Sequence, residues 1–378
     1  MRVIICGDYC PRYKVADTIE EGGFSSILGD IETEISSADY SIVNMECPVI
    51  ENNLKPIIKN GPNLGCSSKG IECLKWAGFN CVTLANNHFL DYGEEGVKTT
   101  IDTIRRYELD YVGGGMNSKD ASAILYKRIG ETTLSLINCC EHEFSIATEK
   151  TAGANPINPI SQYYKIKEAQ KKSDFCLVIV HGGIEHYNLP TPRLQEYCRF
   201  LIDAGANAVI CHHQHCYSGF EDYHNGTIFY GLGNFCFDGN RASGKESWYQ
   251  GYMVDLTIEK EFFKYTLIPY VQCEKTTNVV LAKESDKERF LQNVQMLNEK
   301  ISSSSTIKAE YEKLVSKNRP LYEDAIAPYS NRYLRALRRR GLIPSFFSIK
   351  RIAKIKNYVE CESHRDQLIS VLNNLCQK

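Results

Sequence analysis

Three histidines stand within four positions of this sequence, His212, His213 and His215, directly after the apolar run from Ala206 to Ile210. The whole chain contains nine histidines. Imidazole is a common metal ligand that titrates near neutrality, so crowding three rings costs charge repulsion unless a cation holds them. The run has the pattern of a buried strand, and open α/β sheets bind ligands at the carboxyl ends of strands. A polar turn with chance histidines is the alternative, but the pattern favours a metal site.

Four further polar clusters follow apolar runs that predict strands. They are Gly7-Asp8, Asn44-Met45-Glu46, Asn86-Asn87-His88, and His181-Gly182-Gly183 with Glu185 and His186 close behind. Each cluster alone is equally typical of a helix cap or a turn. Because every cluster occupies the same end of a strand, strands in one sheet would bring them together into one cleft.

The side chains gathered in this cleft would be two carboxylates, an amide and several imidazoles. Oxygen and nitrogen ligands without thiolate suit Mn, Fe or Zn, as one ion or as a pair. Two ions held a few Å apart can clamp a phosphoryl group and generate hydroxide for an in-line displacement. His88, beside a ligand-type asparagine, is placed to protonate a leaving oxygen. The motifs of competing chemistries, Gly-x-Ser-x-Gly, Walker A and Gly-x-Gly-x-x-Gly, do not occur in the sequence.

The composition sets bounds on partners and compartment. The 378 residues are 43% hydrophobic with a formal net charge of −2, which supports a real core and gives no general attraction to nucleic acid. The 16 cysteines are scattered without a Cys-x-x-Cys pair, so we expect reduced thiols rather than a disulfide scaffold or zinc ribbon. We see no signal-peptide pattern and no apolar stretch near the ~18 residues that span a bilayer. We therefore expect a cytoplasmic protein that does not bind nucleic acid.

Apolar runs alternate with amphipathic stretches through the first two thirds of the chain, which predicts an α/β fold. The expected strands are Arg2–Cys6, Tyr40–Val43, Cys81–Leu84, Leu109–Val112, Thr133–Ile137, Phe175–Val180, Ala208–Ile210, Thr227–Tyr230 and Tyr252–Ile258. The expected helices are Ser67–Ala77, Gly93–Arg106, Ser161–Lys171 and Pro192–Ala204. The late strands, from Thr227–Tyr230 to Phe262–Ile268, follow one another closely and should pair antiparallel, giving a mixed sheet or two packed sheets.

The character of the chain changes past about residue 282. Residues 283–317 are rich in Glu, Lys, Gln and Leu and predict helices, so we divide the chain into 1–282 and a helical extension, 283–378. The segment Arg332–Lys356 carries nine basic residues and no acidic one, interleaved with aliphatic and aromatic residues. It would form either a basic helical face packed on the main domain or a docking segment for an anionic membrane surface or acidic partner.

Several segments together resemble a known family. They are Asn44-Met45-Glu46, Leu84 to Gly93, Val112 to Asn117, His181 to Glu185, His212 to His215 and Tyr230 to Asp238. In this order they resemble the successive motifs of the CapA capsule-synthesis family, which is associated with poly-gamma-glutamate capsule synthesis and is similar to calcineurin-like metallophosphatases. The resemblance covers roughly residues 1–282. It implies a metallophosphatase-like layered sandwich with mixed β-sheets, followed here by the helical extension.

The resemblance also implies roles for individual residues. Asp8 would be a ligand of the first metal, Glu46 the ligand that bridges two metals, and Asn87 a ligand followed by the general acid His88. His181, His213 and His215 would complete the ligand set, leaving His212 as a substrate or neighbouring contact. Two departures matter: the phosphatase pattern Asp-x-His has Cys10 where histidine would stand, and the bridging aspartate is replaced by Glu46. One of the two metals would therefore bind weakly, or one ion alone would bind.

From these elements we expect a metal-dependent phosphoesterase-like hydrolase acting in the biosynthesis of a capsule or another cell-surface polymer. Its substrate would be phosphorylated or an anionic, polymer-related molecule, with Glu185 and His186 as orienting residues. An amide hydrolase of a gamma-linked peptide polymer is one alternative. A non-catalytic accessory subunit of a capsule-synthesis complex is another; residues 332–356 would then dock it at a membrane-bound synthase on the inner membrane face.

Overall fold

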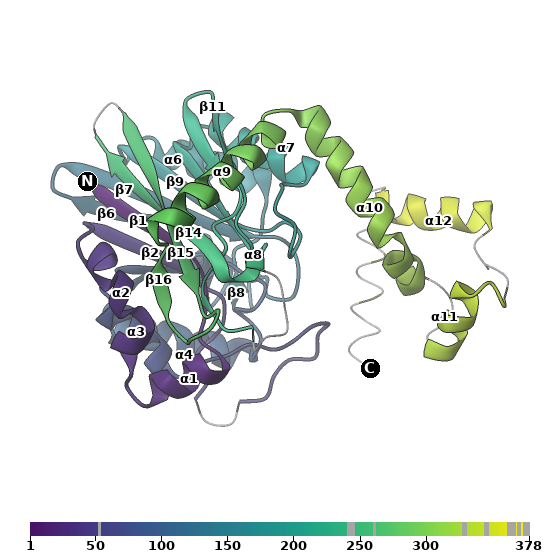
Figure 1. Ribbon diagram of the computed structural model, residues 1–378, viewed down its shortest axis with the longest axis horizontal. Helices are drawn as coiled ribbons and strands as arrows, with labels where there is room; N and C mark the ends of the chain where they lie inside the picture. The colour runs from purple at the N-terminus through teal and green to yellow at the C-terminus, as the bar shows by residue number, and fades with distance from the viewer. Residues whose placement is uncertain are drawn as a thin grey trace. The chain divides into compact units, whose positions relative to one another are not determined.

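The computed structural model describes residues 1–51, 54–239, 246–259, 262–326, 331–343 and 348–360, together with residues 368 and 372. The chain forms two compact units, Met1–Lys308 and Ala309–Lys378. The first unit contains two β-sheets, a short two-stranded sheet and the helices that cover them (Figure 1). All residues expected to form the metal site belong to this first unit.

The first large sheet has eight strands, in the order β16-β15-β14-β1-β2-β3-β4, with β13 also paired to β1. Its strands are β1 (Arg2–Cys10), β2 (Tyr40–Met45), β3 (Cys81–Thr83), β4 (Asp110–Val112), β13 (Asn234–Phe237), β14 (Gln250–Ile258), β15 (Phe263–Gln272) and β16 (Val279–Leu281). The pairs among β1 to β4 are parallel, whereas β14 to β16 add antiparallel strands beyond β1. The carboxyl ends of β1, β2 and β3 therefore share one edge.

The second large sheet has six strands, in the order β11-β12-β10-β9-β7-β6. They are β6 (Leu125–Ile129), β7 (Thr132–Cys140), β9 (Phe175–His181), β10 (Ala208–His212), β11 (Phe220–Tyr223) and β12 (Gly226–Phe229). The four central strands are parallel and the two edge strands antiparallel. A small sheet pairs β5 (Gly114–Gly115) with β8 (Gly153–Ala154).

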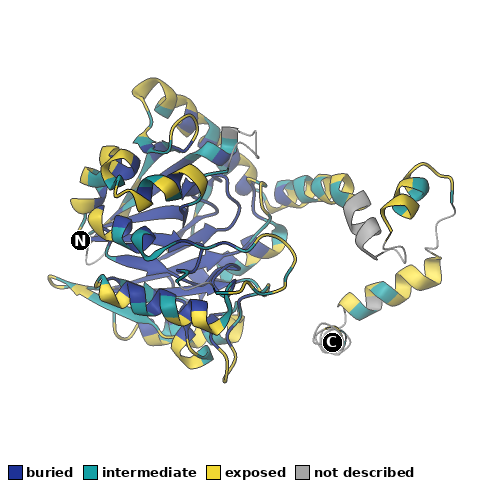
Figure 2. Ribbon diagram, turned by 90° about the horizontal axis from the view of Figure 1, so that it is seen from below, coloured by how far each residue is buried: buried dark blue, intermediate teal, exposed yellow. Residues whose placement is uncertain are grey.

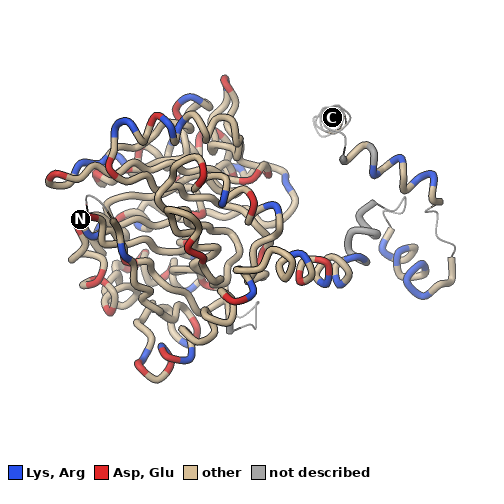
Figure 3. Tube along the Cα trace, turned by 90° about the horizontal axis from the view of Figure 1, so that it is seen from above, with Lys and Arg blue, Asp and Glu red and all other residues tan. Residues whose placement is uncertain are grey.

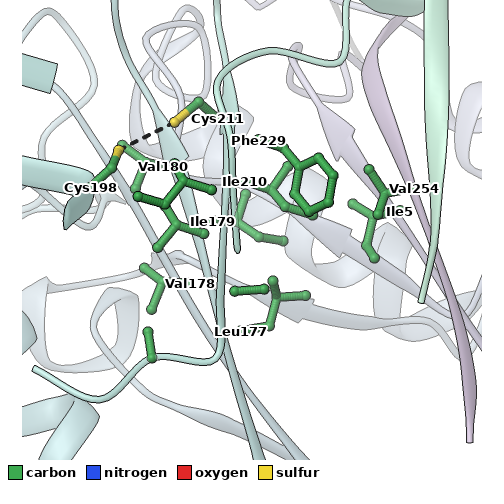
Figure 4. Close-up of a cluster of buried hydrophobic side chains, with 14 of the residues drawn as sticks. Ile5, Leu177, Val178, Ile179, Val180, Cys198, Ile210, Cys211, Phe229 and Val254 are labelled. Carbon is green, nitrogen blue, oxygen red and sulfur yellow. Dashed lines mark hydrogen bonds between the residues drawn. The ribbon is translucent and has the colours of Figure 1, made fainter. Parts of the chain in front are cut away.

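The two sheets pack face to face around a hydrophobic core. Ile5 and Val254 of the first sheet lie in the same buried cluster as Ile210 and Phe229 of the second (Figure 4). Alternate residues of β1, such as Ile4, join a second cluster with the helices on the outer face. These helices are α1 (Tyr13–Glu20), α2 (Phe24–Ser36), α3 (Ser68–Trp76) and α4 (Gly93–Arg106). Buried strands lie inside and exposed residues mark the outer surfaces of the helices (Figure 2).

Helices also cover the outer face of the second sheet. They are α6 (Pro159–Ala169) and α7 (Pro192–Asp203), and two further short helices, α5 (Ser118–Ala121) and α8 (Glu246–Tyr249), lie in connections of the first unit. The Sγ atom of Cys198 in α7 lies 3.5 Å from that of Cys211 in β10, which reports how closely this helix packs on its strand. The expected layered α/β sandwich with mixed sheets is thereby confirmed.

One expectation about the late strands is wrong. The strand expected at Thr227–Tyr230 is β12, which pairs parallel with β10 and antiparallel with β11 in the second sheet. The later strands β14 and β15 do pair antiparallel, but in the first sheet. The chain crosses between the sheets at β13, which pairs parallel with β1. The short connection between β12 and β13 thus joins a strand of the second sheet to a strand of the first.

The division between the units follows Lys308 rather than residue 282. Helix α9 (Glu284–Ile301), which the sequence assigned to the extension, packs on the first unit. Its Phe290 ring lies 4.3 Å from that of Tyr217, and Asn298 Oδ1 accepts a hydrogen bond from the Phe220 amide at 2.7 Å. Ile301 is fully buried. Apolar burial therefore holds this helix on the sandwich.

The second unit is helical where it is described. It contains most of α10 (Ser304–Ile326), together with α11 (Arg332–Arg339) and α12 (Ile349–Glu360). Phe346 and Phe347 of the basic segment lie outside the described residues. Among the residues that are described, no helix combines the length and apolar composition needed to cross a bilayer.

Candidate metal centre

The site forms where the strand ends of the two sheets meet. Parallel register places Asp8 beside Asn44 on β1 and β2, and His181 beside His212 on β9 and β10. The six side chains expected to be ligands are all buried: Asp8, Glu46, Asn87, His181, His213 and His215. The structure thus brings together residues separated by up to about two hundred positions in the chain.

A β-bulge at the end of β1 aims Asp8 into the site. The register of β1 against β2 shifts between Cys6 and Asp8, so the residue between them, Gly7, is left out of the pairing. A Cβ atom on Gly7 would stand 1.9 Å from the carbonyl oxygen of Gly233, so only glycine fits there. The Asp8 amide donates to the same carbonyl at 3.2 Å.

Asp8 has defined partners on both sides. Asn44 Nδ2 donates to Asp8 Oδ1 at 2.7 Å and is itself oriented by Thr83, whose hydroxyl donates to Asn44 Oδ1 at 3.0 Å. The amide of His213 donates to Asp8 Oδ2 at 3.3 Å. Nδ1 of His215 lies 3.6 Å from the same oxygen. Asn44 therefore orients a candidate ligand, a role that the sequence analysis did not assign to it.

Glu46 is the central carboxylate of the site. Its side chain is fully buried, and neither carboxylate oxygen has a hydrogen-bond partner among the described residues. Oε1 lies 3.6 Å from Nε2 of His181 and 3.6 Å from Nε2 of His215. A buried carboxylate without donors is costly unless a cation neutralises it.

Two overlapping groups have the geometry of a metal site. Glu46, His181 and His213 form one, and Asp8, Glu46 and His215 form the other; within each group the potential ligand atoms lie within 4.8 Å of one another. Glu46 is common to both, as a bridging ligand would be. Asn87 adjoins the first group, with its Oδ1 3.1 Å from His181 Nε2. The residues present therefore fit one or two divalent cations with oxygen and nitrogen ligands.

Burial sets the protonation of these groups. It raises the pKa of Glu46 well above its usual value, with neighbouring Asp8 adding to the effect, and it raises the pKa of Asp8. It lowers the pKa of His213 and His215 to about 4 and that of His181 well below its usual value. At neutral pH the imidazoles are uncharged and ready to donate lone pairs, whereas burial opposes ionisation of the two carboxyl groups and a bound cation would favour it.

His212 lies beside the ligand groups without belonging to either. Its Nδ1 is 3.4 Å from Asp8 Oδ1, and neither ring nitrogen has a hydrogen-bond partner among the described residues. Burial lowers its pKa to about 3. The following residues, His213 and His215, have φ angles of 99° and 53°, in the left-handed region that costs a non-glycine residue energy. This strained turn points successive imidazoles toward the carboxylates.

The His88 ring contacts a buried ion pair formed by Lys59 and Asp91. Its Nδ1 lies 2.7 Å from Asp91 Oδ2 and 3.1 Å from Lys59 Nζ, while Lys59 is also ion-paired with Asp91 Oδ1. The Lys59 side chain is 2% exposed. Lys59 is not among the residues predicted from the sequence. With Nδ1 occupied, Nε2 is the ring atom left for proton exchange.

The segment that contains Lys59 is hydrogen-bonded to Asp91. The Leu64 amide donates to Asp91 Oδ2 at 2.6 Å, and the Ile57 amide donates to the Asp91 carbonyl at 2.9 Å. Asn63 Nδ2 donates to both the Ile57 and Asp91 carbonyls. Asp91 therefore orders the connection between β2 and α3 as well as the His88 ring.

Glu185 and His186, the expected orienting residues, are exposed. Glu185 is near enough to raise the pKa of both Glu46 and His213 through its charge. The His186 ring lies 5.6 Å from that of Trp248 and 6.3 Å from that of His215. Both residues thus lie at the exposed border of a buried polar cluster.

Cys10, where the related pattern has histidine, is fully buried. It belongs to neither ligand group. The second group therefore contains two carboxylates and a single imidazole.

Comparisons with known proteins agree with the motifs. The family described as "Bacterial capsule synthesis protein PGA_cap" matches residues 2–239. The chain is 32% identical over 255 residues to the capsule biosynthesis protein CapA of Bacillus anthracis, covering 65% of this chain and 62% of that protein. It is 33% identical over 236 residues to the PGA biosynthesis protein CapA of Bacillus subtilis (strain 168), covering 61% and 62%. Each match spans less than two thirds of the relative's length.

Among solved structures, the chain is similar to a phosphatase from Mycoplasma pneumoniae, at 16% identity with a TM-score of 0.45. The alignment covers 78% of this chain and 98% of that one.

Proposed function

The chain belongs to the bacterial capsule synthesis protein family PGA_cap, and we propose that it is a metal-dependent, phosphoesterase-like hydrolase in the biosynthesis of a capsule or another cell-surface polymer. Its substrate would be a phosphorylated or otherwise anionic molecule related to that polymer. The reaction would take place in the cytoplasm, on the cytoplasmic side of polymer assembly.

The observation that carries this proposal is the state of Glu46. Both of its carboxylate oxygens are buried, the described residues provide no hydrogen-bond donor to either, and two imidazole nitrogens lie 3.6 Å from Oε1. A protein interior tolerates a buried carboxylate when a bound cation neutralises its charge. Glu46, His181 and His213 would hold one ion with Asn87, and Asp8, Glu46 and His215 would hold the other. Mn, Zn and Fe suit this ligand set best.

A divalent ion bound here would supply Lewis acidity toward a phosphoryl oxygen and would make water easier to ionise. The residues of the chain provide the rest. Asn44 holds Asp8 in place, and the strained turn orients His213 and His215. His88, fixed through Nδ1, would deliver a proton from Nε2 to the leaving oxygen. His212 and Glu185 would contact the substrate, from inside the site and from its border.

The test begins with metal content. The purified full chain, loaded in turn with Mn, Zn, Fe(II) or Mg, should retain one or two equivalents by elemental analysis and hydrolyse p-nitrophenyl phosphate or bis-p-nitrophenyl phosphate with at least one of them. Glu46→Gln should lose both metal and turnover. His224→Ala, which changes an exposed histidine paired with Asp203, is the matched control and should lose neither. A chain that binds no metal and turns over neither ester would contradict the proposal.

A second candidate, a non-catalytic accessory subunit of a capsule-synthesis complex, is favoured by Cys10. Because this thiol belongs to neither ligand group, one cation position has three protein ligands of which a single one is imidazole. Stoichiometric metal without turnover of phosphate esters would support this candidate. Release of glutamate from a gamma-linked glutamate peptide would instead support the amide hydrolase.

A further inference from the structure

Helix α11 is amphipathic, with a basic face and an apolar face. Arg332, Arg335 and Arg339 recur at spacings of three and four and so share one face of the helix. Tyr333, Leu334 and Leu337 occupy the opposite face. Tyr333 is 66% and Leu334 41% exposed, and no described residue of α11 is buried. This helix therefore presents an apolar face that the described part of the chain does not cover.

Helix α12 repeats the same division. Ile349, Ile352, Ile355 and Val359 recur at spacings of three, three and four, which places them on one face. Lys350, Arg351 and Lys354 lie on the other. Ile349 is 86%, Ile352 49% and Val359 55% exposed. Ile355 is half-buried, but the other three aliphatic side chains of this face are not covered by the described part of the chain. Large aliphatic side chains exposed together on one helix face are typical of a surface that binds a membrane or a partner.

All charged residues between Arg332 and Lys356 are basic. From Arg332 to Lys356 there are nine basic residues and no acidic one, although the whole chain has a formal net charge of −2. Figure 3 shows lysine and arginine recurring along the two helices. Arg332, Arg335, Arg339 and Arg340 also line one shallow surface pocket. The surface formed by residues 332–343 and 348–356 is therefore both basic and amphipathic, and we call it the basic amphipathic segment.

We propose that the basic amphipathic segment docks the protein on an anionic lipid bilayer. At 8 and 12 residues the helices are too short to cross a membrane, but they suit the interface. There the aliphatic faces would enter the acyl boundary while the long basic side chains reach the headgroups. A nucleic acid would satisfy the charge but would leave Ile349, Ile352 and Val359 exposed. Both properties together favour a bilayer.

Vesicle sedimentation with the full chain tests this proposal. Vesicles of phosphatidylcholine with phosphatidylglycerol should bind it at least about tenfold more tightly than phosphatidylcholine alone, and salt should weaken the binding. The charge variant Arg332→Gln/Arg335→Gln/Lys350→Gln/Arg351→Gln and the apolar variant Leu334→Ser/Ile349→Ser/Ile352→Ser should each lose at least about tenfold in affinity. Two separate variants are needed because charge and apolar contact contribute independently.

The matched control is Lys14→Gln/Lys55→Gln/Lys119→Gln/Lys150→Gln, which removes four exposed lysines from the first unit and should bind vesicles as the parent chain does. Circular dichroism and metal content should be the same for all variants. Equal binding to neutral and anionic vesicles, or full binding by both variants, would overturn the proposal. Binding to RNA or duplex DNA without binding to vesicles would overturn it as well.

Discussion

Nδ1 of His88 lies 2.7 Å from Oδ2 of Asp91, three residues further along the chain. Lys59 contacts both residues from a connection about thirty positions earlier in the chain. The buried ion pair between Lys59 and Asp91 therefore positions the His88 imidazole beside the candidate metal centre. This arrangement links the chemistry of the site to the stability of the segment that surrounds it.

His88→Ala should lower kcat for a phosphate ester by about 10²–10⁴-fold, because it removes the proton donor for the leaving oxygen. The metal content should remain near that of the parent chain, since His88 belongs to neither ligand group. Asp91→Asn should lower kcat less, since the ring remains but loses its charged partner. Steady-state kinetics and elemental analysis on the same samples measure both effects.

His224→Ala is the control for this pair, because it removes an exposed histidine that also pairs with an aspartate. It should leave kcat and metal content unchanged. Loss of metal from His88→Ala would show instead that His88 is a ligand.

Lys59→Met should lower the free energy of unfolding by about 3–5 kcal/mol, because it leaves the buried Asp91 carboxylate without its cation. Lys98→Met is the matched control: it breaks an exposed ion pair with Asp102 and should cost no more than about 0.5 kcal/mol. Urea denaturation of the metal-free chains measures both. The double variant Lys59→Met/Asp91→Asn should recover part of the loss, and a Lys59→Met chain as stable as the parent would contradict the role assigned to the pair.

Local patterns predicted much of this fold. The helix expected at Gly93–Arg106 has these same bounds in the structure, because a continuous apolar stripe and Glu94 and Glu95 in its first turn define it locally. Polar residues after apolar strands likewise predicted the cluster around Asp8, Glu46 and His213. Parallel strands bring their carboxyl ends together within one sheet, but the expectation that a single sheet carries the whole cluster is wrong. Asp8 lies on β1 of the first sheet, whereas His213 follows β10 of the second.

Other features depend on contacts that no local pattern contains. Lys59 lies in a connection without periodicity, and its burial results from the ion pair with Asp91. The apolar pattern of residues 227–230 predicted a strand, but it carries no information about which sheet receives it. Helix α9 is amphipathic like any surface helix, so its composition did not show that Phe290 and Ile301 would join the sandwich.

Acid should destabilise the metal-free chain through its buried imidazoles. The pKa of His215 is about 4 in the folded chain, against about 6.5 when it is exposed in the unfolded chain. Between these values the unfolded state binds more protons, so stability present above about pH 6.5 is lost as the pH falls toward 4. One such histidine contributes on the order of 3 kcal/mol to this loss. Glu46, whose pKa is raised, acts in the opposite direction at higher pH.

The contribution of one histidine is isolated by comparison with a variant. Urea denaturation in EDTA, repeated from pH 7 to pH 4.5, should show a smaller loss of stability for His215→Gln than for the parent chain. His224→Gln, an exposed control, should follow the parent. Parallel pH profiles for the parent and His215→Gln would contradict the burial of a neutral imidazole at this position.

Metal binding at pH 7 should release protons, and Glu46 should be their main source. Burial and the nearby Asp8 raise the pKa of Glu46 well above its usual value, so without a cation the carboxyl resists ionisation. His213 and His215, with pKa values of about 4, are already neutral at this pH and have no proton to lose. Titration calorimetry with Zn²⁺ or Mn²⁺ in buffers of different ionisation enthalpy measures the number released. Glu46→Gln should release fewer protons as well as bind more weakly, whereas His213→Gln should weaken binding without reducing proton release per ion bound. Reduced proton release in His213→Gln, with release unchanged in Glu46→Gln, would show that the imidazole and not the Glu46 carboxyl carries the proton before the metal binds.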